Sequence, residues 1–384
     1  MAREDGGFRG LRNIRRLADI SDKKQREEVE RTLEYGLEAA PSIQDRGIST
    51  FARGHQPAFA GINTFLKAPY VENVKEVGRH EVAIVGAPFD MGTTYRSGAR
   101  FGPQAIRRIS ALYDSYSVDI AVDLQEELDL VDVGDVFVIP SNIEKSFDQI
   151  DRAVSFLAGE GVFPVVLGGD HSIGYPDVRA LAARLEGRVG IIHLDRHLDI
   201  QERDMDERMH TTPWFHATNI PNAPPTNLVQ MGIGGWYGSR PGVKVARDRG
   251  TTVLTITDIE EVGIDKAAEV ALEVAWKDAD AVYLSFDIDS VDAGFVPGTG
   301  SPEPGGLVPR EALKLLRLIA GEGICGMEVV EVAPPYDVSD TTALLACRAV
   351  MDVLGTLVGT GKVGHGRTPE QERAETARQP TPAS

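Results

Sequence analysis

The sequence predicts an α/β protein, a three-layer α/β/α domain with a mainly parallel central sheet, and three observations support this prediction. The runs Phe163–Leu167, Val189–Leu194 and Ala281–Phe286 are continuously apolar, which is typical of strands covered on both faces. Strand-like and helix-like segments alternate without a break in composition between residues 80 and 360, which favours a single domain. Polar residues follow each apolar run, at the strand ends where open α/β sheets bind their ligands.

Those polar residues are good metal ligands. A lone Asp after a strand is as often a helix cap or a turn residue, but three clusters after three buried runs are improbable by chance. Residues i, i+2 and i+4 of an extended segment share one face, so Asp195, His197 and Asp199 are expected to converge, and likewise Asp287 and Asp289. The six expected ligands are His171, Asp195, His197, Asp199, Asp287 and Asp289.

Two imidazoles and four carboxylates exceed what one ion needs, and they suit two divalent ions bridged by shared carboxylates. Four ionised Asp formally neutralise two such ions. A paired-ion site lowers the pKa of a bound water, so that a nucleophile exists near neutral pH. The sequence therefore predicts a binuclear metallohydrolase.

Composition excludes several other classes. The formal net charge of −18 argues against a nucleic-acid partner, which needs a basic surface, and gives weak support to a cationic substrate. We find no apolar run near 18 residues and expect no membrane span. The start, Met1–Gly7, lacks an apolar signal region, so we expect a cytoplasmic protein. Cys325 and Cys347 lie in apolar stretches and are expected to be buried, reduced thiols.

The ends of the chain differ from its middle. We expect a partly helical extension over residues 1–60, a catalytic domain over 61–362 and a disordered tail over 363–384, where polar residues and Pro replace the apolar pattern. His365 in that tail is expected to be solvated rather than a ligand.

Longer motifs make a family resemblance plain. The chain resembles the ureohydrolases, the arginase and agmatinase family, over roughly residues 80–355. Two further segments, Asp206–His216 and Gly232–Trp236, resemble the nickel-dependent guanidine hydrolases. The segments that carry the family resemblance are Arg96–Pro103, Gly168–Ser172, Asp195–Asp199, Ser285–Asp292, Pro297–Gly306 and Glu328–Glu331.

The resemblance implies an arginase-like sheet of about eight strands and a homohexamer. It also implies two divalent ions per subunit, nickel by the closer likeness and manganese by the wider family. One ion would be held by His171, Asp195, Asp199 and Asp287, and the other by His197, Asp195, Asp287 and Asp289. Asp195 and Asp287 would thus be the bridging carboxylates.

By the same resemblance, Glu331 binds the substrate guanidinium, since a carboxylate pairs well with two N–H donors of a planar cation. His210 would bind substrate and carry a proton to the leaving amine, with His216 as its competitor. Asp199 would act in catalysis as well as bind metal. A surface position is the alternative for Glu331, although its neighbours are apolar.

The sequence also allows predictions for several residues near the ligands. Trp214 and Phe215 could wall the pocket and contact substrate, or anchor a loop in the core. His193 is expected to be a hydrogen-bonded core histidine, and Asp170 to bond around the ligands without touching metal. Arg196 stands where agmatinases and arginases usually have alanine, and we expect its side chain to pair with Glu202 or Asp204.

Three functions remain open. The first is hydrolysis of guanidine, or of a very small guanidino compound, to urea and ammonia. The second is release of urea from a longer alkylguanidine, as in an agmatinase or guanidinobutyrase. The third is a non-catalytic partner subunit of an active paralogue, which the complete set of six ligands argues against.

Overall fold

The computed structural model describes residue 23 and residues 58–364. By its internal contacts the chain divides into a unit Met1–Ile62 and a unit Asn63–Ser384. The predicted N-terminal extension lies outside the described residues except for residues 23 and 58–60. The predicted tail lies outside them from His365 onward.

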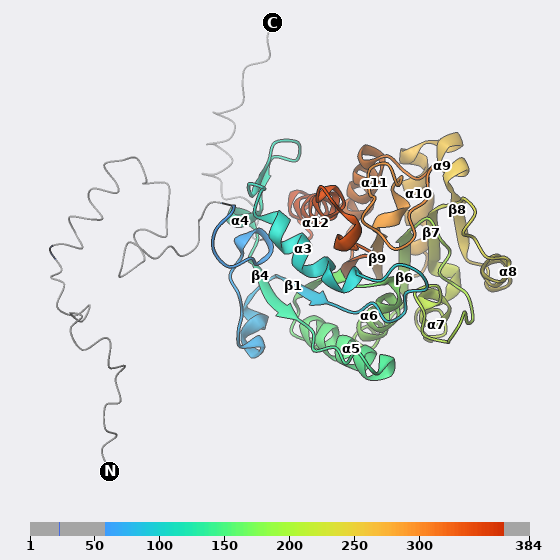
Figure 1. Cartoon of the computed structure of the whole chain (residues 1–384), viewed down its shortest axis with the longest axis horizontal. Coiled ribbons are helices and arrows are strands. Elements are labelled where there is room, and N and C mark those ends of the chain that lie inside the picture. Colours follow the sequence, from blue (N-terminus) through green and yellow to red (C-terminus); the bar gives the residue numbers. More distant parts are fainter. Residues whose placement is uncertain (1–22, 24–57, 365–384) are drawn as a thin grey trace, which may run out of the picture. The chain divides into compact units, whose positions relative to one another are not determined.

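An eight-stranded sheet forms the centre of the described unit, and every strand pair in it is parallel. The order is β4-β1-β5-β10-β9-β6-β7-β8, and Figure 1 shows helices on both sides of it. The predicted arginase-like α/β fold is thus confirmed. The strands are β1 (Val82–Ala87), β4 (Leu130–Asp135), β5 (Phe163–Gly168), β6 (Val189–Leu194), β7 (Leu228–Ile233), β8 (Thr252–Thr255), β9 (Ala281–Asp287) and β10 (Gly326–Val330).

The helices divide between the two faces of the sheet. Residues of α3, α10, α11 and α12 join one hydrophobic cluster with the sheet, and residues of α5, α6 and α8 join the other. A short antiparallel pair, β2 (Tyr116–Ser117) and β3 (Val122–Asp123), stands apart from the main sheet. The α-helices are α3 (Gly102–Ser110), α4 (Leu124–Glu127), α5 (Ile143–Gly159), α6 (Gly174–Ala182), α7 (Pro213–Ala217), α8 (Arg240–Arg249), α9 (Ile256–Val262), α10 (Ile264–Ala275), α11 (Pro309–Gly321) and α12 (Thr341–Gly359).

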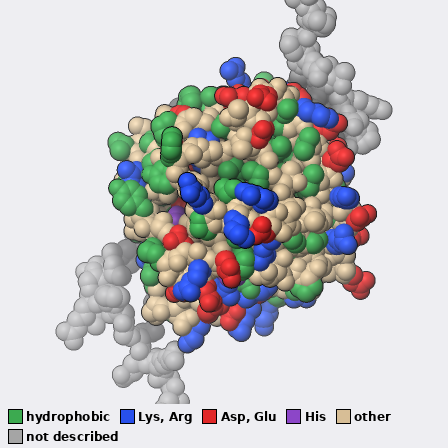
Figure 2. All heavy atoms as spheres, turned by 90° about the vertical axis from the view of Figure 1, so that its right-hand side faces the viewer, with side chains coloured by type: hydrophobic (Ala, Val, Ile, Leu, Met, Phe, Trp, Pro, Cys, Tyr) green, Lys and Arg blue, Asp and Glu red, His purple; other side chains and the backbone are tan. Residues whose placement is uncertain are grey.

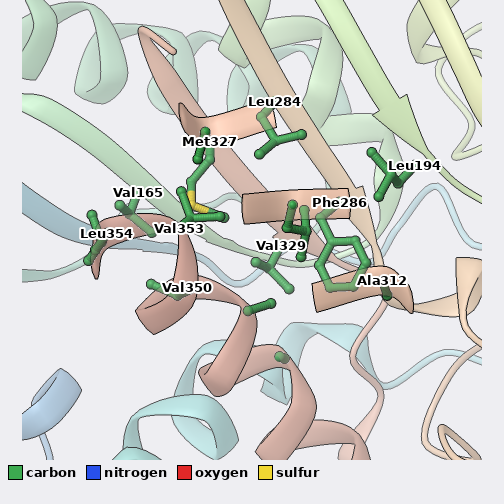
Figure 3. Close-up of a cluster of buried hydrophobic side chains, with 14 of the residues drawn as sticks. Val165, Leu194, Leu284, Phe286, Ala312, Met327, Val329, Val350, Val353 and Leu354 are labelled. Atoms are coloured by element: carbon green, nitrogen blue, oxygen red, sulfur yellow. The ribbon is translucent and has the colours of Figure 1, made fainter. Parts of the chain in front are cut away.

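Alternate residues of each strand serve opposite faces. In β1, Val82 and Ile84 belong to the first cluster, whereas Ala83 and Val85 belong to the second. Because both faces are covered, the strand needs apolar residues throughout, which explains the continuous runs in the sequence. Figure 3 shows the first cluster, where side chains of β5, β6, β9 and β10 meet side chains of α11 and α12.

Helix α12 corrects one expectation. With 19 residues and a mean hydropathy of 1.5, it is long and apolar enough, by length and composition alone, to cross a membrane, so an apolar run near 18 residues does exist. In the structure 67% of that apolar window is buried, and Val350, Val353 and Leu354 pack against the sheet (Figure 3). The helix therefore has the place of a core helix.

Candidate metal centre

The sheet order brings the predicted ligands together. Strands β5, β10, β9 and β6 are neighbours, and polar residues stand at or directly after the carboxyl end of each. His171 follows β5 in the short helix η6 (His171–Ile173), Glu331 follows β10, and Asp287 ends β9. Parallel strands present their carboxyl ends at one edge, so segments far apart in sequence meet there.

The six predicted ligands form two groups of potential donor atoms. His171, Asp195, Asp199 and Asp287 offer ligand atoms within 4.8 Å of one another, and Asp195, His197 and Asp289 form the second such group. His171 Nδ1 lies 3.1, 3.1 and 2.9 Å from oxygens of Asp195, Asp199 and Asp287. Of the described residues, only Asp195 belongs to both of these groups. The bridging role of Asp287 therefore stays a prediction.

The ligands do not converge along one face of an extended segment, which is the arrangement that the sequence suggested. Strand β6 ends at Leu194, the His197 amide donates to Asp195 Oδ1 at 2.6 Å, and Asp199 has a φ of 44°. Asp289 lies in the short helix η8 (Ile288–Ser290), where its amide donates to Asp287 at 2.8 Å. Tight turns, rather than strand alternation, thus aim these carboxylates, and the left-handed conformation of a non-glycine residue stores strain at the site.

His171 is prepared as a metal ligand. Its Nε2 lies 2.9 Å from Ser285 Oγ, to which it can donate, and its buried Nδ1 has no hydrogen-bond partner. A donor bond from one ring nitrogen leaves the lone pair of the other free to bind a cation. Burial opposes a charge on His171, but the three carboxylates that Nδ1 faces raise its pKa well above the ordinary value, so this position favours a proton or, in its place, a metal cation.

The electrostatics of the cluster fit two divalent cations. Burial, followed by the charges of Asp289 and Asp195, raises the pKa of Asp287 well above its ordinary value. Burial is also the main cause that raises the pKa of Asp289 to about 7. Without a counter-cation these buried carboxyls hold protons, and binding a metal releases them. The donor set, four carboxylates and two imidazoles, therefore matches the binuclear site that the sequence predicts.

Glu331 and His210 stand together beside this cluster. Glu331 Oε1 accepts from the His171 amide at 3.0 Å and lies 2.9 Å from His210 Nδ1. Burial opposes charge on both groups, but their pairing lowers the pKa of Glu331 and raises that of His210 to about 9. Glu331 has a φ of 63°, and its amide donates to Gly169 at 2.8 Å. The surface alternative for Glu331 is wrong, because its side chain is buried.

These groups line a pocket of about 310 Å³. Sequence reasoning missed several of its walls. Thr94, whose Oγ1 lies 2.8 Å from His210 Nε2, sits just before the Arg96–Pro103 segment, and Tyr237 directly follows the Gly232–Trp236 segment. The described lining residues are Thr94, His197, Leu198, Asp199, Gln201, Asp204, His210, Thr211, Tyr237, Gly238, Ser239, Asp287, Asp289, Ser301 and Glu331.

Trp214 does not line the pocket, so the expectation that it contacts substrate is wrong. Its side chain is fully buried, and its ring lies edge-on to His171 with centroids 5.4 Å apart. Phe215 is also absent from the described lining and packs under the guanidinium of Arg249, 3.9 Å from its ring centroid. Both residues anchor the loop behind the ligands. His216 bonds to the Glu207 carbonyl at 2.7 Å, outside the pocket, so the position of His210 favours it as the proton carrier.

Two other residues near the ligands, His193 and Asp170, have the contacts that the sequence analysis expected. His193 is a buried, hydrogen-bonded histidine as expected, 2.7 Å from Asp195, and burial lowers its pKa. Asp170 accepts from the amides of Gly92 and Ser172 and belongs to neither group of ligands.

Arg196 does not pair with Glu202 or Asp204. Its guanidinium donates to the carbonyls of Gly232 and Pro304, each at 3.2 Å, and faces Glu303 at 3.9 Å. The predicted pairing was wrong because the Arg196 side chain points inward, toward the loops of Gly232 and Pro304, and not toward residues 202–204 that follow it in the sequence.

Fold and donor set together define a metal-dependent hydrolase. The model of the arginase family matches residues 80–355, and the chain belongs to this family of ureohydrolases. It is 33% identical to guanidinobutyrase of Pseudomonas aeruginosa over 305 residues, covering 79% of this chain and 94% of that protein. It is 37% identical to mitochondrial agmatinase of Gallus gallus over 302 residues, covering 78% and 86%.

Solved structures give the same result. Proclavaminate amidinohydrolase from Streptomyces clavuligerus superposes with a TM-score of 0.72 at 34% identity, covering 79% of this chain and 100% of that one. Arginase from Bacillus caldovelox superposes with a TM-score of 0.63 at 27% identity, covering 73% and 98%.

Proposed function

We propose that this chain hydrolyses guanidine to urea and ammonia. The supporting observation is the charge of the pocket. Its described lining includes five carboxylates, of which Asp199, Asp287 and Asp289 would be neutralised by the predicted cations. Asp204 and Glu331 remain, and none of the described lining residues is Lys or Arg. A guanidino acid would bring its carboxylate close to Asp204 and Glu331, without a lining Lys or Arg to pair with it, which is costly in a partly desolvated site. A cationic substrate that has no carboxylate suits the lining.

Glu331 would bind the guanidinium. Its Oε1 is engaged by His171 and His210, and a Cβ built on Gly300 would lie 3.1 Å from its Oε2, so a side chain at that position would crowd the oxygen. A carboxylate held in this way orients a planar cation through charge-assisted hydrogen bonds. The buried setting excludes water from the contact and strengthens it.

His210 would carry the proton to the departing nitrogen. Its Nδ1 faces Glu331, while its Nε2 lies 2.8 Å from Thr94 Oγ1, which can accept, and 3.2 Å from the Thr94 amide, which can donate. The surroundings thus satisfy both the protonated and the neutral ring, as a proton carrier requires. In the overall reaction water adds its oxygen to the guanidinium carbon, one C–N bond breaks, and ammonia leaves with the proton.

The predicted cations would be held by the two groups of ligands around His171 and His197. When bound, such a pair supplies Lewis acidity and lowers the pKa of a water, so that a nucleophile is available near neutral pH. We propose nickel, because intrinsic affinity ranks nickel above manganese at a site with imidazole ligands, and because of the likeness to nickel-dependent guanidine hydrolases. Manganese is the alternative.

A guanidino amine such as agmatine is the second candidate. Asp204 is an exposed carboxylate at the pocket, and it could receive the second cationic end of such a substrate. The relatives named guanidinobutyrase and agmatinase bear names of longer substrates. Trp214 and Phe215 are not among the described lining residues, so they do not narrow the pocket against a longer chain. The likeness of segments 206–216 and 232–236 to guanidine hydrolases keeps guanidine first.

The deciding experiment measures urea released from guanidine, agmatine, arginine and 4-guanidinobutyrate by enzyme reconstituted separately with Ni²⁺ and Mn²⁺. We expect the highest kcat/KM for guanidine, then agmatine, with little turnover of 4-guanidinobutyrate. A preference for 4-guanidinobutyrate would refute the charge argument. Absence of urea from every substrate, despite a full metal content, would favour the non-catalytic partner instead.

The proposal also covers the location of the enzyme in the cell, its oligomeric state and its partners. We propose a cytoplasmic homohexamer, and light scattering that gives a monomer mass at micromolar concentration would contradict the hexamer. The face drawn in Figure 2 carries basic and acidic side chains interspersed, without a continuous basic band. Together with the net charge of −18, this supports an enzyme that acts on a small molecule, without a nucleic-acid or membrane partner.

A further inference from the structure

Arg196 joins three loops at the carboxyl ends of the strands. It follows β6, its side chain is only 4% exposed, and its Nη1 and Nη2 donate to Gly232 near the end of β7 and to Pro304 after β9. Its own carbonyl accepts from the Gly234 amide at 3.1 Å. A buried guanidinium needs such acceptors, because without them its desolvation would be uncompensated.

Glu303 continues this connection. Its carboxylate lies 3.9 Å from Arg196 Nε and accepts from the Trp236 amide at 2.6 Å. The packing is close: a Cβ at Gly234 would collide with the Arg196 guanidinium, and one at Gly235 with the Glu303 carboxylate. The buried pair of Arg196 and Glu303 therefore holds the backbone from Gly232 to Trp236. Arg196 bonds to the beginning of this segment, and Glu303 bonds to its end.

The segment that is held in this way leads directly into the pocket. Tyr237 lines it, and its ring stands edge-on to the predicted ligand His197, with centroids 5.6 Å apart and planes at 86°. Gly238 and Ser239 line the pocket as well. Tyr237 is the residue directly after the Trp236 amide that bonds to Glu303, so that bond fixes the backbone immediately before it.

We propose that Arg196 is a positioning residue: with Glu303 it holds the 232–239 loop so that Tyr237 forms a fixed wall of the pocket and limits the length of the guanidino substrate. The inference rests on the proposed function for its substrate. By this proposal Tyr237, rather than Trp214, would exclude longer substrates. A wall held from behind acts mainly by clashing with longer chains, so its loss changes the preference among substrates more than it changes the chemistry.

The test compares full-length, metal-loaded wild type with Arg196→Met, which keeps much of the side-chain volume and removes the donors. We expect the guanidine-to-agmatine ratio of kcat/KM to fall by about tenfold, mainly through KM, with an unchanged metal content. Arg196→Lys, which keeps one charged donor group, should restore part of the ratio. Arg348→Met is the matched control, since Arg348 pairs with Asp352 and Asp119 and is not in the pocket lining.

A double-mutant cycle asks whether Arg196 acts through Tyr237. Tyr237→Ala should shift the ratio by itself, and adding Arg196→Met should then change it little further, because the wall is already gone. Additive effects, or an unchanged ratio in Arg196→Met, would overturn the proposal.

Hydrogen exchange gives a readout that needs no substrate. In Arg196→Met the amides of residues 232–239, that of Trp236 above all, should exchange faster than in wild type, whereas Arg348→Met should leave them unchanged. Unaltered exchange there would overturn the inference even if turnover changed. If wild type releases no urea from guanidine or agmatine, the proposed function fails, and the exchange experiment still decides whether Arg196 holds the loop.

Discussion

The shared position of Asp195 leads to an asymmetric prediction for metal content. Asp195 belongs to both groups of ligands, whereas Asp199 belongs only to the group around His171. If wild type holds about two ions per subunit, Asp195→Asn should hold close to none, and Asp199→Asn about one. Each variant removes one negative charge, so total charge alone would affect both equally. Both should lose urea release.

Stability has to be separated from binding in this comparison. Asp195 also accepts from the His197 amide and lies 2.7 Å from His193 Nε2. Losing a buried partner costs about 1–3 kcal/mol for each group left unsatisfied. Asparagine keeps an oxygen acceptor and the side-chain volume, and thermal unfolding monitors what remains of the fold. Metal is measured by mass spectrometry after desalting. Equal metal loss in two folded variants would refute the assignment of Asp195 as the shared ligand.

Three further outcomes are expected. Trp214→Ala should lower the free energy of unfolding by about 3–5 kcal/mol in denaturant titrations, because it empties a fully buried site, while a folded fraction keeps the wild-type substrate ranking. Asp204→Asn should reduce kcat/KM for agmatine and leave that for guanidine within about twofold, since only the longer substrate reaches the rim. In chelated protein, the pKa of His210 is raised from its ordinary value of 6.5 to about 9, so its pairing should stabilise the fold fully below pH 6.5 and lose this effect as the pH rises through about 9. The free energies of unfolding of wild type and His210→Asn should therefore converge as the pH rises across that window. A difference that stays constant would contradict this prediction.

The strands could be predicted because their physical cause is local in sequence. Covering both faces of a parallel strand requires apolar residues at every position, so the run Val189–Leu194 and the strand β6 coincide. The order of the strands has no such local signal, and the sequence did not predict it; the family resemblance gave only their approximate number. Helix α12 was not recognised as an apolar run from the sequence. Because it packs against the sheet, it can be apolar enough to match the length and composition of a membrane span.

The ligands were predictable as residue types, whereas their geometry was not. The expectation of a shared strand face failed at Asp199 and Asp289, which lie in a left-handed turn and a short helix. A positive φ at a non-glycine residue depends on tertiary contacts that over-determine it, and no sequence pattern records those contacts. For Glu331 the contacts are visible, since its amide bonds to Gly169 and its carboxylate to the His171 amide.

Reaction type and substrate choice depend on different parts of this fold. The predicted ligands and Glu331 sit at the ends of four neighbouring central strands, where the sheet fixes their spacing and apolar runs mark their place in the sequence. The walls of the pocket come from loops, among them those of Thr94, Asp204 and Tyr237, whose places are set by distant partners such as Glu303. Motifs can therefore identify a ureohydrolase, while the identity of its guanidino substrate is decided by loop contacts that appear only once the chain has folded.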